Sequence, residues 1–374
     1  MKRVFDFVEH FDWVLLIAAL APTALGLVTI YGISISQEQA GLFTFYKQLV
    51  AAGIGLVIVV GLAMIDYRHL RSFGLVSYLG GAALLLLVLF FGETVRGTQG
   101  WFRLGNLSFQ PVEIAKITLV LYLATLFSRY AHGRLTWRVF GTSAGAVGLY
   151  AALILFQPDF GSAMVVLGVW AILCLFAGLP RWAWLIIPSV CLVLSLLLWN
   201  FGLKPYQRDR LTTFLNPQTD IRGSGYNAAQ ARIAIGSGGW FGKGIGEGSQ
   251  ARLRFLPEAA TDFIFAVIGE ELGFVGLALT LGLFLLIIYR YLRLAYDSED
   301  DFTALMLVGL AGILLIHVVV NGGMNMGIMP ITGIPMPLLS AAASSLVVTF
   351  ITVGFAESVA MRRRSKSGRE KASE

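Results

Sequence analysis

Apolar residues occur in long uninterrupted runs along this chain, separated by short polar segments. A helix needs about 20 apolar residues to cross the hydrocarbon core of a bilayer, and its backbone must satisfy its own hydrogen bonds there. Each run is therefore predicted to be a transmembrane helix. The ten expected spans are residues 13–32, 48–65, 73–91, 111–128, 139–156, 160–179, 183–201, 263–289, 303–320 and 338–360.

Composition agrees with this pattern. Of the 374 residues, 57% are hydrophobic and 13% are charged, and the mean hydropathy is +0.76. These values exclude a soluble globular domain and predict an all-α integral membrane protein. The first apolar run has full spanning length and follows Asp6, Glu9 and Asp12, so no cleavable signal peptide is expected.

The distribution of Lys and Arg predicts the orientation. With ten spans both termini lie on one side, whose segments carry sixteen Lys and Arg residues, against Lys47, Arg96 and Arg103 in the short segments opposite. Positive charge marks cytoplasmic segments, so both termini are expected to be cytoplasmic. This topology and a basic tail near anionic lipid explain the net charge of +6, and nucleic-acid binding is not expected.

The chain is predicted to form a single polytopic membrane domain over residues 1–360, followed by a basic, disordered cytoplasmic tail over residues 361–374. A large extracytoplasmic loop, residues 201–262, joins the seventh and eighth spans. A loop this long is usually functional or disordered, and its aromatic and cationic residues favour function. Residues 228–235 have apolar side chains at helical spacing and are expected to form a short surface helix.

Cysteine and histidine give no sign of a metal or disulfide site. Cys174 and Cys191 lie in adjacent spans and are expected to pack there without forming a disulfide. The four histidines are scattered without metal-ligand spacing, so no metal ligands are predicted. His317, inside a span, is expected to pack between helices.

Asp262 is the strongest candidate for chemistry. It closes the long outer loop and opens an apolar span. At that junction a carboxylate can meet a lipid-anchored substrate in a partly dry environment, where it becomes a better proton acceptor. The alternative is an N-cap of the following helix, a position that Asp favours.

Other ionisable residues are expected at a similar depth. Glu113 and Lys116 share a helix face and can pair, in either a structural or a catalytic role. Asp159 is either a turn residue or part of the site. Glu270 and Glu271, about two turns into the eighth span, are expected to support the structure through hydrogen bonds, with one of them bonded to another helix.

Asn321 and Asn325 are expected to flank the outer end of the ninth span, so the polar residues of the spans collect at one depth. A pump that moves charge across the bilayer should show polar groups at several depths. The pattern therefore predicts a site that opens outward only, and it favours an enzyme over a transporter.

The outer segments also carry candidate binding groups. Arg208, Arg210 and Lys243 can attract an anion, together with backbone amides of the glycine run 236–248, although a mobile loop is an equal alternative. The run is not a nucleotide P-loop, because the residue after its lysine is neither Ser nor Thr. Trp101 is typical of an interfacial anchor, and a sugar-stacking or lipid-guiding role is the sharper alternative.

Short motifs run through much of the chain. They are Gly100-Trp101-Phe102, Gln110-Pro111-Val112-Glu113-Ile114-Ala115-Lys116, Gln157-Pro158-Asp159-Phe160-Gly161, Tyr206-Gln207-Arg208-Asp209-Arg210, Gly225-Tyr226-Asn227, Ile233-Ala234-Ile235-Gly236-Ser237-Gly238-Gly239, Gly242-Lys243-Gly244, Phe255-Leu256-Pro257-Glu258, Thr261-Asp262-Phe263-Ile264-Phe265-Ala266 and Gly269-Glu270-Glu271-Leu272-Gly273. This set resembles the SEDS family of bacterial cell-wall polymerases, and within it the RodA-like elongation branch.

One segment departs from the family. Members usually carry a Ser-Tyr-Gly-Gly-Ser-type sequence where this chain has Ser340-Ala341-Ala342-Ala343-Ser344. Small residues are retained, so close helix packing survives. A tyrosine hydroxyl and some backbone freedom are lost.

The resemblance implies that lipid II, a disaccharide-pentapeptide on a polyprenyl pyrophosphate, is polymerised into glycan strands at the outer face of the bacterial cytoplasmic membrane, for cell elongation and rod shape. A sugar hydroxyl of one substrate attacks the anomeric carbon of another and expels the lipid pyrophosphate with inversion. The alternative is a flippase that carries the same lipid-linked precursor across the bilayer.

The resemblance also implies residue roles and partners. Asp262 is expected to be the base, with Glu258 in a supporting position, and Arg208, Arg210, Lys243 and, less strongly, Lys116 are expected to stabilise the pyrophosphate. A divalent cation (Mg or Mn) can share that charge, although no ligand set is evident. The expected partner is a class B penicillin-binding protein, a single-span transpeptidase.

Overall fold

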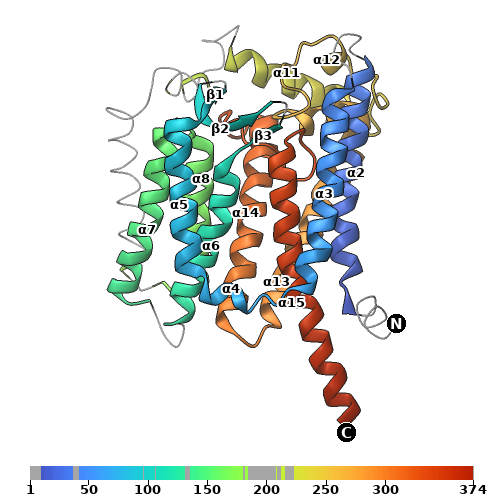
Figure 1. The fold of residues 1–374 in the computed structure, drawn as a ribbon. Coiled ribbons are helices and arrows are strands. Elements are labelled where there is room, and N and C mark those ends of the chain that lie inside the picture. The colour runs from blue at the N-terminus through green and yellow to red at the C-terminus, as the bar shows by residue number, and fades with distance from the viewer. Residues whose placement is uncertain are drawn as a thin grey trace.

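The computed structural model describes residues 10–36, 42–95, 97–105, 107–130, 135–179, 182–183, 208, 212–214 and 223–373. Its long helices run side by side in one bundle (Figure 1). They are α2 (Trp13–Ser36), α3 (Phe43–Met64), α5 (Gly74–Phe91), α6 (Pro111–Ser128), α7 (Trp137–Phe156), α8 (Phe160–Phe176), α13 (Ile264–Tyr296), α14 (Asp301–Met326) and α15 (Ala343–Ser373), and the short α4 (His69–Ser72) precedes α5.

Eight of these helices are long and apolar enough to cross a membrane, and α8 is a shorter apolar helix of 17 residues. The all-α membrane fold predicted from the hydrophobic runs is thereby confirmed. The expected seventh span, residues 183–201, lies outside the described residues except for Ala183.

Two differences between the observed helix bounds and the predicted spans affect the site. The last long helix begins at Ala343, not at residue 338, because Pro337 and the positive φ of Leu338 (64°) keep the preceding segment out of the helical conformation. The ninth span continues to Met326. Asn321 and Asn325 therefore lie inside α14 and do not flank it.

The bundle has an apolar exterior and a partly polar interior. Val57, Phe90 and Phe91 on α3 and α5 are 72%, 73% and 74% exposed, as expected for side chains that contact lipid. By contrast, Glu113 of α6 and His317 of α14 are only 5% and 1% exposed. Polar groups that face the bundle interior avoid the cost of contact with the hydrocarbon core.

A small antiparallel sheet, which the sequence analysis did not predict, lies between α5 and α6. Its strands are β1 (Glu93–Val95), β2 (Thr98–Leu104) and β3 (Leu107–Phe109), in the order β1-β2-β3. Gly105 between β2 and β3 has a φ of 59°, which a tight hairpin turn requires and glycine adopts without strain. Figure 1 shows this sheet at the same end of the bundle as α11 and α12.

The described part of the outer loop contains two helices, α11 (Ser224–Ser237) and α12 (Ser249–Arg252). The first confirms the short helix expected over residues 228–235. The following glycine-rich segment packs closely on α13, which is kinked at Gly273 (φ 65°, ψ −160°).

The helix α15 continues past the apolar run to Ser373, and the disordered tail expected over residues 361–374 stays a prediction. Lys, Arg, Glu and Ala residues are good helix formers, and residues 361–373 contain no proline to end the helix. The start of α2 and the end of α15 lie at the end of the bundle opposite the sheet (Figure 1).

Candidate active site

A cavity of about 320 Å³ lies against the three-stranded sheet. Its wall combines side chains from α3, the sheet, α6, α8, the turn before α13 and the segment before α15. The charged, polar and aromatic side chains in the wall are Lys47, Thr98, Trp101, Arg103, Ser108, Gln110, Glu113, Asp159, Ser162, Thr261, Asp262, Thr332 and Ser344. Segments far apart in the sequence thus meet at one cavity, and the predicted base is among them.

Asp262 is half-buried in the turn that leads into α13. The N-cap residue of α13 is Phe263, without a side-chain capping bond, so Asp262 does not have the N-cap position considered as an alternative. Gly333 lies close to its carboxylate, because a Cβ at this glycine would be 3.5 Å from Asp262 Oδ2. The carboxylate is therefore at the cavity wall.

The segment that departs from the family motif is part of the same wall. Residues 341–343 line the cavity, and the Ala341 N–H donates a hydrogen bond to the carbonyl of Ala260 at 2.8 Å. Ser340 Oγ donates to the carbonyl of Thr261 at 2.6 Å. Backbone and hydroxyl bonds thus hold the turn before α13, and neither bond needs the missing tyrosine.

Two cations in the cavity wall come from separate elements. Arg103 of β2 pairs with Ser108 of β3 in the sheet register, and Lys47 Nζ of α3 donates to Ser108 Oγ at 3.0 Å. Trp101 from β2 lines the same cavity. An anion that entered the cavity would meet two positive charges and one aromatic side chain.

Lys47 and Arg103 were not predicted from the sequence to belong to the site and served only to predict the topology. Their spacing of 56 residues gives no local sign that they meet. Two features of the sequence could have indicated them. Both are cations in short segments that carry few charges, and Arg103 directly follows the aromatic pair Trp101-Phe102.

The ion pair predicted between Glu113 and Lys116 is confirmed. Lys116 Nζ lies 2.8 Å from Glu113 Oε1 and 2.9 Å from His317 Nε2. Lys116 is only 3% exposed and is not among the residues that line the large cavity. Lys116 thus contacts Glu113 and His317 in this structure, and its contact with substrate stays a prediction.

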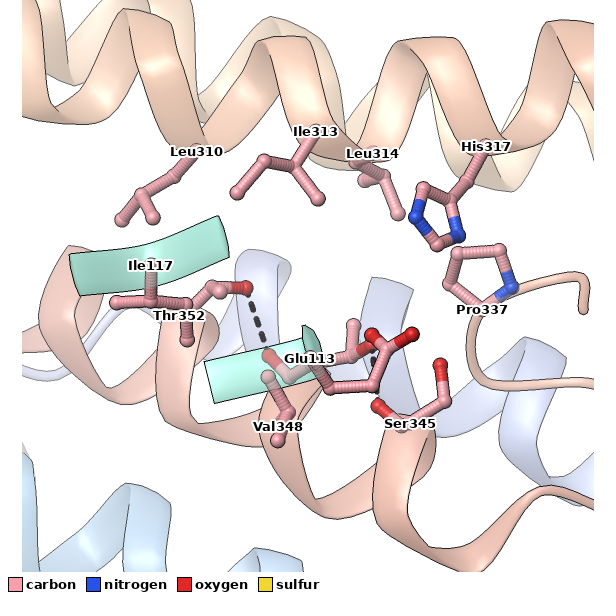
Figure 2. A pocket seen from close by; sticks show the side chains of 11 residues that line it. Glu113, Ile117, Leu310, Ile313, Leu314, His317, Pro337, Ser345, Val348 and Thr352 are labelled. Carbon is pink, nitrogen blue, oxygen red and sulfur yellow. Dashed lines mark hydrogen bonds between the residues drawn. The ribbon is translucent and has the colours of Figure 1, made fainter. Parts of the chain in front are cut away.

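Glu113 belongs to the wall of two cavities. Besides the large cavity, it lines a small one of about 20 Å³ between α6, α14 and α15. Figure 2 shows Glu113 and Ser345 on one side of this space, with Leu310, Ile313, Leu314 and His317 of α14 on the other. Glu113 therefore connects the cavity that contains Asp262 to the buried polar cluster below it.

Asp159 is both a helix cap and a cavity residue. It is the N-cap of α8, and its carboxylate accepts hydrogen bonds from Ser162 N at 2.9 Å and Ser162 Oγ at 2.7 Å. Gln110 Nε2 donates to the same carboxylate at 3.4 Å. Asp159 therefore has a structural role at the start of α8, and its side chain also lines the cavity.

Glu270 and Glu271 hold the glycine-rich loop against α13. Glu270, fully buried, accepts hydrogen bonds from Lys243 Nζ at 2.8 Å and Ser249 Oγ at 3.0 Å. Glu271 accepts a hydrogen bond from Gly246 N at 2.9 Å. Lys243 is thus paired with a carboxylate, and it is not one of the residues that line the large cavity.

The remaining predicted site residues lie outside the cavity wall or outside the described residues. Glu258 is exposed, with a φ of 59°, and accepts a hydrogen bond from Thr261 Oγ1 at 3.1 Å. The carbonyl of Arg208 accepts a hydrogen bond from Thr212 Oγ1 at 3.1 Å. Arg210 lies outside the described residues.

Within the residues that the structure describes, no group of three or more His, Cys, Asp and Glu side chains is arranged to hold a metal ion. Asp262, Asp159 and Glu113 are the carboxylates in the cavity wall. A divalent cation shared with a bound pyrophosphate stays a prediction.

The cavity has three carboxylates, two cations and an aromatic side chain in its wall and lies at the end of an apolar helical bundle. This arrangement fits a membrane enzyme that acts at the bilayer surface. The profile of the cell cycle protein family FtsW/RodA/SpoVE matches residues 12–365. The chain belongs to this family, as the motifs of its outer segments predicted.

Relatives with assigned names agree with this membership. The peptidoglycan glycosyltransferase MrdB of Escherichia coli is 36% identical, covering 98% of each chain. The peptidoglycan glycosyltransferase RodA of Treponema pallidum is 34% identical, covering 95% of this chain and 99% of the relative.

Two solved structures are similar to this one. A chain from a peptidoglycan synthase complex, described for its coordination of polymerization and crosslinking, has a TM-score of 0.80 and 33% identity over 94% of this chain and 98% of the other. The rod shape determining protein RodA of Thermus thermophilus has a TM-score of 0.70 and 32% identity over 94% of this chain and 97% of the other. The chain is thus a multi-pass membrane protein of the RodA-like type.

Proposed function

We propose that this protein is a peptidoglycan glycosyltransferase that polymerises lipid II into glycan strands during cell elongation, with Asp262 as the general base. The relatives named peptidoglycan glycosyltransferases support the reaction class. The observation that carries the residue assignment is the Asp262 carboxylate in the wall of a cavity that also contains Lys47, Arg103 and Trp101.

The reaction needs one proton acceptor and a site for a leaving anion. Asp262 takes the proton from the acceptor sugar hydroxyl, and the hydroxyl oxygen forms a bond to the anomeric carbon of the donor. The bond from that carbon to the lipid pyrophosphate breaks, and the pyrophosphate leaves with its electron pair on the opposite face. General-base assistance of this kind contributes about 10²–10⁴ in rate.

Lys47 and Arg103 are the cations that we assign to the pyrophosphate. Cations held at the place where charge develops stabilise the transition state without having to reorganise. Both residues lie beside Ser108, so a single anion can contact both of them. Contacts of the same anion with Arg208, Arg210, Lys243 and Lys116, expected from the sequence, stay predictions.

The proposed topology places both termini in the cytoplasm and the cavity at the outer face of the bacterial cytoplasmic membrane. The asymmetry of Lys and Arg supports this orientation.

The proposed partner is a class B penicillin-binding protein, a transpeptidase that crosslinks the new strands. Similarity to a chain of a peptidoglycan synthase complex supports such a partner. Glycan synthesis by the purified protein is expected to rise when this partner is added, and equal rates would contradict that expectation.

The test is glycan synthesis from labelled lipid II by purified protein. Asp262→Asn preserves the shape of the side chain and removes its basicity, so it is expected to lower turnover by at least about 100-fold while thermal stability stays near that of the parent. Asp301→Asn, at the exposed cytoplasmic start of α14, is the matched control and should keep normal turnover.

The same protein in vesicles separates this function from lipid II transport. Loss of polymer in Asp262→Asn, with the fold intact, supports the glycosyltransferase. Translocation of lipid II that persists in Asp262→Asn, without polymer formation by the parent protein, would support the flippase instead.

A further inference from the structure

Two buried asparagines lie on the face of α14 that is turned toward the start of α13. Asn321 and Asn325 are four residues apart, so they share one helix face with His317, four residues before Asn321. Both asparagines are 0% exposed. An amide group buried in a membrane bundle is costly unless its donors and acceptors are satisfied, so the contacts of these side chains are informative.

Both amides contact the same backbone atom of Asp262. Asn321 Nδ2 and Asn325 Nδ2 each donate to the carbonyl oxygen of Asp262 at 3.0 Å. Asn321 Nδ2 also donates to the carbonyl of Ile334 at 2.8 Å. Asn325 Oδ1 accepts a hydrogen bond from the N–H of Ala266 at 3.2 Å, in the first turn of α13.

These contacts complete a set around the turn before α13. The carbonyls of three consecutive residues, Ala260, Thr261 and Asp262, accept hydrogen bonds from Ala341 N, Ser340 Oγ and the two asparagine amides, respectively. All of the donors belong to α14 or to the segment before α15. The turn that carries Asp262 is therefore held by neighbouring elements, and its backbone cannot rotate without breaking these hydrogen bonds.

We propose that Asn321 and Asn325 are positioning residues that fix the Asp262 carboxylate at the cavity, an inference that rests on the proposed function of Asp262 as the base. Asn321 also holds Ile334, next to Gly333, whose Cα faces the carboxylate. The two asparagines of α14 thus hold both Asp262 and the segment that contains Gly333, the two sides of this contact. Neither asparagine is among the residues that line the cavity, so they act through Asp262.

This role makes a specific kinetic prediction. Asn325→Leu keeps approximate size and removes the amide that bonds Asp262 and Ala266. Because displacement of a reacting group by about 1 Å can cost about 100-fold in rate, kcat is expected to fall by about this factor. KM for lipid II should change less than about twofold, since an interaction made with the base alone leaves substrate binding intact.

The experiment compares purified Asn325→Leu, Asp262→Asn and the double variant in the lipid II polymerisation assay, with thermal unfolding measured in parallel. Asn325→Leu added to Asp262→Asn should lower the residual rate no further, because the positioned base is already absent. Thr280→Val is the matched control. It removes a buried hydroxyl of α13 that bonds only the carbonyl of Gly276 within its own helix, and its kcat should be normal.

Ser340→Ala provides a second variant should Asn325→Leu fail to fold. It removes the hydroxyl that bonds the carbonyl of Thr261, and a fall in kcat without a change in KM is again expected. The proposal is overturned by a normal kcat in folded Asn325→Leu, by an increase in KM alone, or by a full additional loss in the double variant. Failure of both variants to fold would also overturn the proposal, because the hydrogen bonds of Asn325 and Ser340 would then be needed for folding itself. If Asp262→Asn keeps full activity, the proposed base is wrong, which is a different outcome.

Discussion

The Lys243 ammonium lies 2.8 Å from the fully buried Glu270 carboxylate. This ion pair connects the glycine-rich loop after α11 to the N-terminal part of α13. Ser249 Oγ and the N–H of Gln250 donate to the same carboxylate, so Glu270 holds three groups of the loop. The cation of a conspicuous Gly-Lys-Gly motif thus has a structural partner.

Loss of this pair is expected to affect stability more than substrate binding. Lys243→Met leaves the buried Glu270 carboxylate without its partly exposed cation, and loss of a hydrogen bond to a charged group costs about 1.5–3 kcal/mol. Thermal unfolding should detect the loss, and Glu270→Gln added to Lys243→Met should restore part of it. A rise in KM for lipid II with unchanged stability would instead return Lys243 to the substrate site.

Removal of the cavity cations Lys47 and Arg103 is expected to affect substrate turnover more than stability. Lys47→Met and Arg103→Met should each lower kcat/KM for lipid II by about tenfold or more, because a hydrogen bond to a charged group is worth about 1.5–3 kcal/mol. Arg252→Met is the control, since this exposed arginine pairs with Glu247 outside the cavity. Equal activity of all three variants would exclude Lys47 and Arg103 from pyrophosphate binding.

The buried pair below the cavity is expected to be sensitive to one-sided substitution. Lys116→Met leaves the Glu113 carboxylate buried without its cation beside His317, a change that costs about 3–5 kcal/mol. The melting temperature in detergent should fall clearly. Adding Glu113→Gln removes the uncompensated charge and should recover part of the stability, and a double variant less stable than Lys116→Met would contradict this account.

Substitution of two glycines of α13 tests whether the kink at Gly273 requires glycine. Gly273 has a φ of 65°, and a Cβ there would lie 2.5 Å from Gly242 N and 2.6 Å from the Trp240 carbonyl carbon. Gly273→Ala is therefore expected to displace the glycine-rich loop and lower the melting temperature. Gly282→Ala, with nothing within 4 Å of its Cβ position, should leave stability unchanged or raise it by up to about 1 kcal/mol. Similar melting temperatures for the two variants would show that the kink does not require glycine.

Some contacts of the site could be predicted locally. Glu113 and Lys116 are three residues apart on one helix, so helical geometry alone brings them together, and the structure confirms the pair. Asp262 could be singled out because it stands at the boundary between a polar loop and an apolar run. The partners of Glu270 could not be predicted in this way, because Lys243 and Ser249 reach it through a loop whose path the sequence does not define.

The sequence by itself determined the membrane fold, because the cost of burying polar groups in lipid acts on each apolar run separately and leaves a pattern that can be read locally. It also determined the family, through the motifs of the outer segments. Only the tertiary structure decided which groups surround Asp262. Lys47, Arg103 and Asn325 come from different helices and a hairpin, and helix packing over long sequence separations brings them together, which no short-range pattern encodes.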